Sequence, residues 1–147
     1  MLDQTGSAEY LLSGGVIHPW HMDQFGHMNV RWYAHFFDDA SFLLLSRLGL
    51  HQAAVIKEFG VHCVTAQATT EFRAEVLAGA CVDIFGSVSR IGGKSVTFEY
   101  RMTSAGTEVE HALCRSVEVF VDAKTHKSVT IPEGLRERLG TAQNATQ

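Results

Sequence analysis

The residues best suited to do chemistry lie in segment 19–29, PWHMDQFGHMN, which is rich in polar and aromatic side chains and has no helical or strand period. Within it, Asp23 shortly precedes Val30, where a helical pattern begins. The first turn of a helix presents unpaired N–H groups at the positive end of the helix dipole, and these can stabilise a carbonyl oxygen that gains negative charge. A carboxylate beside that turn could attack the carbonyl carbon or deprotonate an attacking water molecule. Taken alone, a loop aspartate before a helix is more often a cap or a solvated residue.

Three more residues of this segment favour a site at the start of the helix. Gly26 lets the backbone turn tightly between the acid and the helix, because glycine enters positive φ without strain. His27 and Asn29 add hydrogen-bond donors at the same place, and Asn29 is also a suitable N-cap.

Histidines in this segment and just before it raise the alternative of a metal site. Three of them and one aspartate lie close together in the chain: His18, His21, Asp23 and His27. Nitrogen and carboxylate ligands suit zinc or iron, but this spacing matches none of the compact metal signatures. His35 and Asp39 have the i, i+4 spacing of a hydrogen bond on a helix surface. We therefore expect no metal and no other cofactor.

A helix over residues 30–49 is expected to position the site. Its apolar residues recur at spacings of three and four: Tyr33, Phe37, Ala40, Leu44 and Leu48. Other apolar side chains surround this stripe, so most of the helix must be covered. Asp38 and Asp39 are adjacent and cannot face each other, so at most one of them points into a cleft.

The remaining pattern is that of strands. A short strand with a bulge near Gly14 and Gly15 is expected over 10–18, and alternating patterns follow over 64–74, 82–88, 96–102 and up to 121. Turns are expected at 92–93 and 105–106, and Pro132 begins a short helix. We predict an α+β fold in a single domain over 10–139, with disordered ends at 1–9 and 140–147.

Composition narrows the function classes. An apolar content of 46%, 19% charged residues and only 2 prolines in 147 residues exclude general disorder. A net charge of −4 argues against nucleic-acid binding, and no apolar run is long enough for a membrane span. The first residues do not look like a secretory signal. The three cysteines, Cys63, Cys81 and Cys114, lie in apolar segments, which predicts buried thiols and a cytoplasmic protein.

The string Asp23-Gln24-Phe25-Gly26-His27-Met28-Asn29, followed by Tyr33, resembles the signature D-x-x-G-H-x-N-x-x-x-Y of hotdog-fold acyl-CoA thioesterases of the 4-hydroxybenzoyl-CoA thioesterase type. The resemblance implies a five-stranded antiparallel sheet wrapped around one long central helix. It also implies a homodimer, or a homotetramer built from it, with active sites at the subunit interface. The implied reaction is metal-free hydrolysis of an acyl-CoA to the free acid and CoA.

Carried over residue by residue, Asp23 is the catalytic acid, either nucleophile or general base, and the backbone N–H of Val30 binds the thioester carbonyl. The other motif residues would shape the substrate pocket: Gly26, His27, Asn29 and Tyr33. Three residues beside the 92–93 turn could bind the phosphates of the substrate: Arg90, Lys94 and Ser95.

Two departures leave alternatives open. Many relatives have a proline and a Gly-Asp pair where this chain has Glu75-Val76 and Gly79-Ala80, and this affects the acyl side of the pocket. A rival branch places its catalytic carboxylate on the long helix, where Asp38 and Asp39 are available. An acyl-thioester hydratase or dehydratase and a non-catalytic acyl-thioester-binding protein are the alternative functions. The acyl group, and its carriage by CoA or by a carrier protein, stay open.

Overall fold

Five antiparallel strands and three α-helices make up residues 6–145, the part of the chain that the computed structural model describes. In chain order, the elements are β1 (Glu9–Val16), the short 3-10 helix η1 (Pro19–His21), α1 (Val30–Arg47), α2 (Gln52–Phe59), β2 (Val61–Phe72), β3 (Cys81–Ile91), β4 (Ser95–Ser104), β5 (Glu110–Asp122) and α3 (Glu133–Asn144). The strands form one sheet in the order β1-β3-β4-β5-β2. The predicted α+β class is confirmed, and the arrangement is consistent with the hotdog fold.

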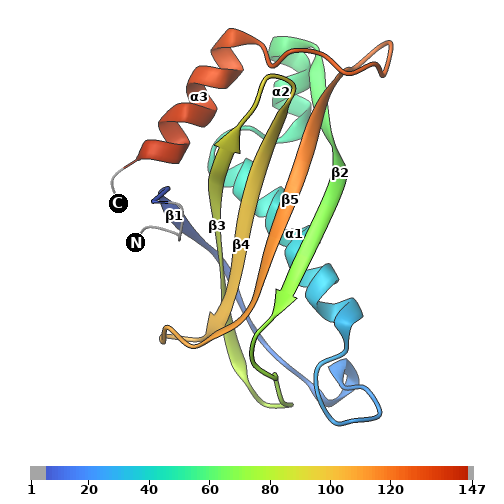
Figure 1. Cartoon of the computed structure of the whole chain (residues 1–147), viewed down its shortest axis with the longest axis vertical. Coiled ribbons are helices and arrows are strands. Elements are labelled where there is room, and N and C mark those ends of the chain that lie inside the picture. Colours follow the sequence, from blue (N-terminus) through green and yellow to red (C-terminus); the bar gives the residue numbers. More distant parts are fainter. Residues whose placement is uncertain (1–5, 146–147) are drawn as a thin grey trace.

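The helix α1 lies along one face of the sheet, and α2 and α3 pack near one end of it (Figure 1). Contacts of α1 with β1, β3 and β4 form the centre of the core, while α2 packs on β2 and α3 on β3. The helix α2 was not predicted from the sequence. None of the helices within residues 6–145 is long and apolar enough to cross a membrane.

The sequence pattern of α1 accounts for its position. The Asn29 side chain accepts a hydrogen bond from the Arg31 N–H, which confirms the predicted N-cap. Four residues of the predicted stripe are buried: Tyr33, Phe37, Ala40 and Leu44. The helix has 18 residues and ends at Arg47, two residues earlier than predicted. Other apolar side chains of α1 stay exposed in this chain, among them Val30 at 64% and Phe42 at 61%.

Charged side chains pair on the face of the sheet that points away from α1. Arg101 bonds the buried Glu9 carboxylate, with Nε–Oε2 at 2.6 Å, and so links β4 to β1. Arg115 of β5 bonds Glu99 at 3.0 Å and Glu71 at 3.2 Å. Since successive side chains of a strand alternate between faces, these ion pairs leave the α1 side mainly to apolar and hydroxyl side chains, with the carboxylate of Glu118 as an exception.

The two ends of the chain differ from the sequence prediction. Residues 7–9 are buried, and residues 140–144, expected to be disordered, form the last turn of α3. The Ala8 N–H donates to the Gln143 carbonyl at 2.9 Å, and the Tyr10 hydroxyl donates to the Ala142 carbonyl at 2.8 Å. Each end is therefore ordered by the other. Residues 1–5 and 146–147, included in the same expectation, lie outside the described residues.

Two smaller expectations also need correction. Cys81, predicted to be a buried thiol, is exposed, whereas Cys63 and Cys114 are buried. Cys81 is the first residue of β3, and the end of a strand is covered by fewer neighbours than its middle.

The bulge of β1 lies between Leu11 and Ser13, because the register to β3 shifts there and not at the following glycines.

Leu44 and Leu43 offer a matched test of the stripe, since Leu44 is 0% exposed and Leu43 is 40% exposed. We expect Leu44→Ala to lower the free energy of unfolding by about 2–5 kcal/mol, because it leaves a cavity between α1 and the sheet. Leu43→Ala should cost less than about 1 kcal/mol. Denaturant titration measures both, and equal losses would contradict the assigned face of α1.

Candidate active site

A tight loop holds Asp23 beside the first turn of α1. The Asp23 N–H donates to the His27 carbonyl at 2.8 Å, and the Gly26 N–H donates to the Asp23 carbonyl at 3.1 Å. The carboxylate bonds its own loop, because Oδ1 accepts from the Phe25 N–H at 2.8 Å and from the His27 N–H at 3.4 Å. Within residues 6–145, Oδ2 has no hydrogen-bond partner. Asp23 thus caps its loop with one oxygen and leaves the other without a partner among the described residues.

Gly26 makes this turn possible. Its φ is +81°, a backbone conformation that other residues adopt only with strain. No atom lies within 4 Å of the position that a Cβ would take, so a larger residue would meet strain and no clash. The Met28 N–H donates to the Val76 carbonyl at 2.9 Å and ties the loop to the segment after β2.

The first turn of α1 presents a backbone donor beside the acid. The Asn29 side chain binds the Arg31 N–H at 3.0 Å, and the Asn29 carbonyl accepts from the Trp32 N–H at 3.0 Å. Val30 is the first helical residue, so its N–H has no acceptor inside the helix. No other acceptor for it occurs in the part of the chain that the structure describes. An unpaired donor therefore sits at the positive end of the helix dipole.

One cavity of about 270 Å³ brings these groups together. It is lined by Asp23, His27, Met28, Val30, Tyr33, Phe72, Arg73, Ala74 and Glu75. Four residues predicted for the site thus meet in one place: Asp23, His27, Val30 and Tyr33. Gly26 and Asn29 do not line the cavity and act through the turn and the helix cap.

The far wall of the cavity comes from the end of β2 and the residues after it. The His27 Nε2 lies 3.2 Å from a Glu75 carboxylate oxygen. Tyr33 packs edge-on against Phe72 with ring centroids 5.0 Å apart. Burial, together with the negative charge of Glu75, raises the pKa of Tyr33, so its hydroxyl stays protonated. Sequence reasoning missed Glu75 and Phe72 as site residues, although it marked Glu75 as a departure from the family pattern.

The residues expected to bind phosphates lie elsewhere in the chain. The Ile131 N–H donates to the Gly93 carbonyl, so the β3–β4 turn, with Arg90, Lys94 and Ser95, packs near the start of α3. The other end of β3 lies at the same end of the molecule as the Asp23 loop, because the Ile17 N–H, just before η1, donates to the Ala80 carbonyl, just before β3. Since β3 rises roughly 3.3 Å per residue, about 30 Å separate its two ends. Within one chain, the structure does not bring this turn to Asp23.

The histidines before α1 have partners of other kinds. The buried His21 accepts the His18 N–H on Nδ1 at 2.8 Å and packs against Trp32 with ring centroids 4.7 Å apart. Burial lowers the pKa of His21, and the charges of His18 and His35 lower it further. Among residues 6–145, no three His, Cys, Asp or Glu side chains are placed to hold a metal ion. His35 and Asp39 lie 3.6 Å apart on the surface of α1.

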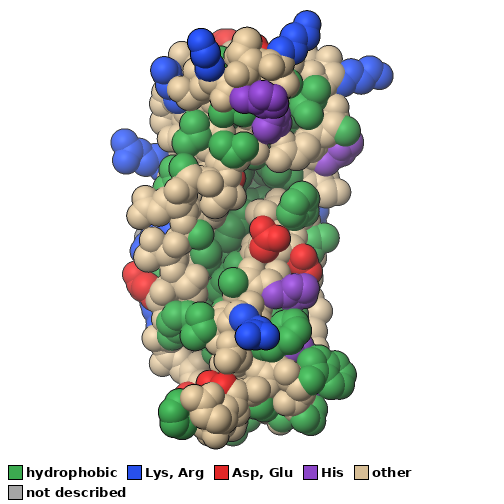
Figure 2. Space-filling model, turned by 90° about the vertical axis from the view of Figure 1, so that its right-hand side faces the viewer, with side chains coloured by type: hydrophobic (Ala, Val, Ile, Leu, Met, Phe, Trp, Pro, Cys, Tyr) green, Lys and Arg blue, Asp and Glu red, His purple; other side chains and the backbone are tan. Residues whose placement is uncertain are grey.

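Asp38 and Asp39, the two helix carboxylates kept as alternatives, point in different directions, because adjacent residues of a helix do not face each other. Both are exposed, but Asp39 faces His35, whereas Asp38 borders a second cavity, between α1 and the sheet. Figure 2 shows the face of the molecule that carries α1 and β2, and this face is hollowed along its middle, with apolar side chains inside the hollow. Only Asp38 is thus available as a rival to Asp23.

One family model matches most of the chain. The sequence matches the model of the thioesterase-like superfamily over residues 17–139. No curated protein matches it. Among solved structures, the probable thioesterase YbaW from Escherichia coli has a TM-score of 0.78 at 18% identity, covering 92% of this chain and 100% of that one. The 1,4-dihydroxy-2-naphthoyl-CoA thioesterase from Synechocystis has a TM-score of 0.73 at 14% identity, covering 92% and 96%. The PA5185 protein from Pseudomonas aeruginosa has a TM-score of 0.71 at 28% identity, covering 91% and 92%.

The Asp23 loop can be tested with a pair of glycines. Gly26 and Gly60 both have positive φ and no atom within 4 Å of an added Cβ, but only Gly26 borders the acid. Alanine at either position should cost about 1–2 kcal/mol of stability through backbone strain. We expect only Gly26→Ala to lower kcat of thioester hydrolysis, by roughly tenfold or more, because it displaces the carboxylate. An equal kcat for the two variants, measured by thiol release, would mean that the loop does not position a catalytic group.

Proposed function

Because the chain belongs to the thioesterase-like superfamily and is a thioester hydrolase, we propose that it hydrolyses an acyl-CoA to the free acid and CoA in the cavity beside Asp23. The observation that carries this proposal is the pairing of one unbonded Asp23 oxygen with the unpaired Val30 N–H on the same cavity. Fold relatives named as thioesterases of 1,4-dihydroxy-2-naphthoyl-CoA and gentisyl-coenzyme A support a CoA thioester as the substrate.

In the proposed reaction, the thioester carbonyl oxygen accepts a hydrogen bond from the Val30 N–H, which stabilises the negative charge of the tetrahedral intermediate. Asp23 Oδ2 either attacks the carbonyl carbon or takes a proton from an attacking water molecule. In the first route, a mixed anhydride forms as the CoA thiolate leaves, and water then hydrolyses the anhydride. In the second route, the water oxygen adds to the carbonyl carbon, and the tetrahedral intermediate then expels the CoA thiolate, so no acyl-enzyme forms. His27, held by Glu75, borders the cavity as a further donor.

We propose that the active unit is a homodimer formed through β2. The edge of β1 is partly occupied, because the Arg47 side chain bonds the Leu11 carbonyl at 3.2 Å and α3 bonds Ala8. The edge strand β2 is open, and most of its side chains from Val64 onward are exposed. A second copy would continue the sheet and cover apolar side chains such as Phe72, which is 52% exposed. This assembly would also provide cover for the apolar flanks of α1.

This assembly would change the position of the phosphate-binding residues relative to the site. A two-fold axis perpendicular to the sheet pairs β2 with itself in antiparallel fashion, so the second copy is inverted end to end. The β3–β4 turn of one copy then lies at the same end as the Asp23 loop of the other. Arg90, Lys94 and Ser95 would meet the CoA phosphates across the dimer, with the substrate bound between the copies.

The assignment of Asp23 is tested by Asp23→Asn, which keeps the shape of the side chain but removes its ability to act as base or nucleophile. We expect kcat for a panel of aromatic and medium-chain acyl-CoAs to fall by about 100-fold or more. The matched control is Asp39→Asn on the exposed side of α1, which should retain activity. A normal kcat in Asp23→Asn would transfer the catalytic role to Asp38, and enoyl absorbance changes without thiol release would favour a hydratase.

The phosphate contacts are tested by replacing Arg90 and Lys94 together with alanine. Phosphate contacts are equal in the ground and transition states, so we expect KM for acyl-CoA to rise more than kcat falls. An unchanged KM would contradict only the role of the two cations.

The proposed assembly is tested by light scattering, which should give a dimeric or tetrameric mass at micromolar concentration. Full activity in a monomer would contradict the shared site.

A further inference from the structure

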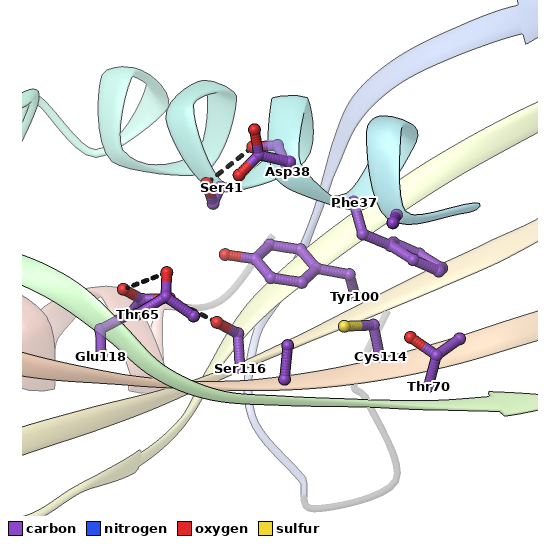
Figure 3. Close-up of a pocket in the computed structure, with 11 residues that line it drawn as sticks. Phe37, Asp38, Ser41, Thr65, Thr70, Tyr100, Cys114, Ser116 and Glu118 are labelled. Atoms are coloured by element: carbon purple, nitrogen blue, oxygen red, sulfur yellow. Dashed lines mark hydrogen bonds between the residues drawn. The ribbon is translucent and has the colours of Figure 1, made fainter. Parts of the chain in front are cut away.

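A second cavity, of about 320 Å³, lies between α1 and the strands β2, β4 and β5 (Figure 3). The helix contributes Ala34, Phe37, Asp38 and Ser41, and the sheet contributes Thr65, Ala68, Thr70, Tyr100, Cys114, Ser116 and Glu118. Val30, Ala34, Asp38 and Ser41 follow one another along one side of α1 at spacings of three and four. The second cavity therefore adjoins the first, further along the same side of the helix.

The Tyr100 hydroxyl is the unexplained group in this cavity. Its side chain is 1% exposed, and its oxygen has no hydrogen-bond partner in the described structure. Burial raises the pKa of Tyr100 well above its usual range, and the negative charge of Glu118 adds to this effect, so the hydroxyl stays protonated. In Figure 3 the hydroxyl points into the space between Ser41 on the helix and Thr65 on β2. A buried hydroxyl without a partner is unfavourable, which suggests that a polar ligand group completes it.

Glu118 lies on the sheet side of the same space and is 5% exposed. The Thr65 hydroxyl is 3.0 Å from both of its carboxylate oxygens, and the Ser116 hydroxyl donates to one of them. Among residues 6–145, no Lys or Arg forms an ion pair with Glu118. An ionised carboxylate offers about four acceptor positions, so two hydroxyl donors leave it short of partners.

Asp38 borders the cavity from the helix side, at its exposed rim. Its backbone carbonyl accepts from the Ser41 hydroxyl at 2.7 Å, and its side chain has no partner in the described structure. The lining includes no Lys, Arg or His, so two carboxylates and one tyrosine hydroxyl share a space without a positive charge. An ammonium group has three N–H donors, one for each of these three groups, and its positive charge offsets one of the two carboxylates.

We propose that this cavity binds the far end of the acyl group and that the enzyme prefers acyl chains that end in a primary ammonium group. The inference rests on the proposed function, since it takes the thioester carbonyl to lie at the Val30 N–H. From Val30 to Asp38 the helix rises about 12 Å at roughly 1.5 Å per residue. An extended chain covers about 1.2 Å per bond, so an ω-amino acyl chain of roughly eight carbons reaches the carboxylates.

The substrate test compares 8-aminooctanoyl-CoA with nonanoyl-CoA, which has the same number of chain atoms and a methyl group in place of the ammonium. We expect kcat/KM to be higher for the amino substrate by roughly tenfold, the usual contribution of a hydrogen bond to a charged group. With 8-hydroxyoctanoyl-CoA, which donates but carries no charge, the value should be lower than with the amino substrate. Equal or better hydrolysis of the other two chains would overturn the inference while leaving thioester hydrolysis intact.

Three variants assign the preference to the cavity. Glu118→Gln and Tyr100→Phe should each lower the ratio of the two kcat/KM values by severalfold, and Asp39→Asn, on the exposed side of α1, should leave it unchanged. Thermal unfolding checks that each variant folds, and Asp38→Asn, whose side chain has no partner to lose, replaces Glu118→Gln if that one does not. An unchanged ratio in the folded variants would overturn the role of the cavity.

Binding is measured independently of turnover in Asp23→Asn by calorimetry, where the Kd of 8-aminooctanoyl-CoA should be lower than that of nonanoyl-CoA. The same order of affinities in a variant that cannot hydrolyse either compound would support the inference by itself. Failure of all acyl-CoAs to release thiol with the unmodified enzyme would instead overturn the proposed function, and equal Kd values would overturn only the preference for a cation.

Discussion

The packing of α1 against the sheet is the constraint on which the candidate site depends. An α-helix has 3.6 residues per turn, so burying Tyr33, Phe37 and Leu44 fixes the direction of every other side chain of α1. The same rotation directs Val30, Asp38 and Ser41 toward the hollow beside β2. A shift of one residue in the buried stripe would rotate the helix by about 100° and turn the side chains of Asp38 and Ser41 away from that hollow. The core and the site are therefore specified by one periodic pattern.

The Asp23 loop reconciles two roles that compete at the level of sequence. An aspartate before a helix is usually explained as a cap, and Asp23 does bond backbone N–H groups of its own loop. The cap of α1, however, is Asn29, so Asp23 is not needed for the helix. Its backbone bonds with His27 and Gly26 shape the loop, and the N–H groups that hold the carboxylate occupy only one of its oxygens. Structural and chemical use of the same side chain are compatible here.

What could be predicted from the sequence is what local patterns determine. The stripe on α1, the Asn29 cap and the clustering of Asp23, His27, Val30 and Tyr33 all depend on residues close together in the chain. The sequence did not predict α2, because eight residues carry too few turns to show a period. Glu75, Tyr100 and Glu118 reach α1 only through the pairing of distant strands, which no local pattern reports. The distance of Arg90 and Lys94 from Asp23 likewise follows from strand length and direction.

The bonds between the two ends of the chain affect the order in which the protein can be completed. Ala8 and Tyr10 are held by Gln143 and Ala142, so contacts of the first strand span almost the whole sequence. During synthesis, residues 7–10 are made well before α3 and can gain these partners only after α3 has been made. Contacts of such long sequence separation carry a large loop-closure cost and are typical of slow steps in folding. β1 can therefore pair with β3 before α3 exists, but its contacts at Ala8 and Tyr10 are completed only with the last helix.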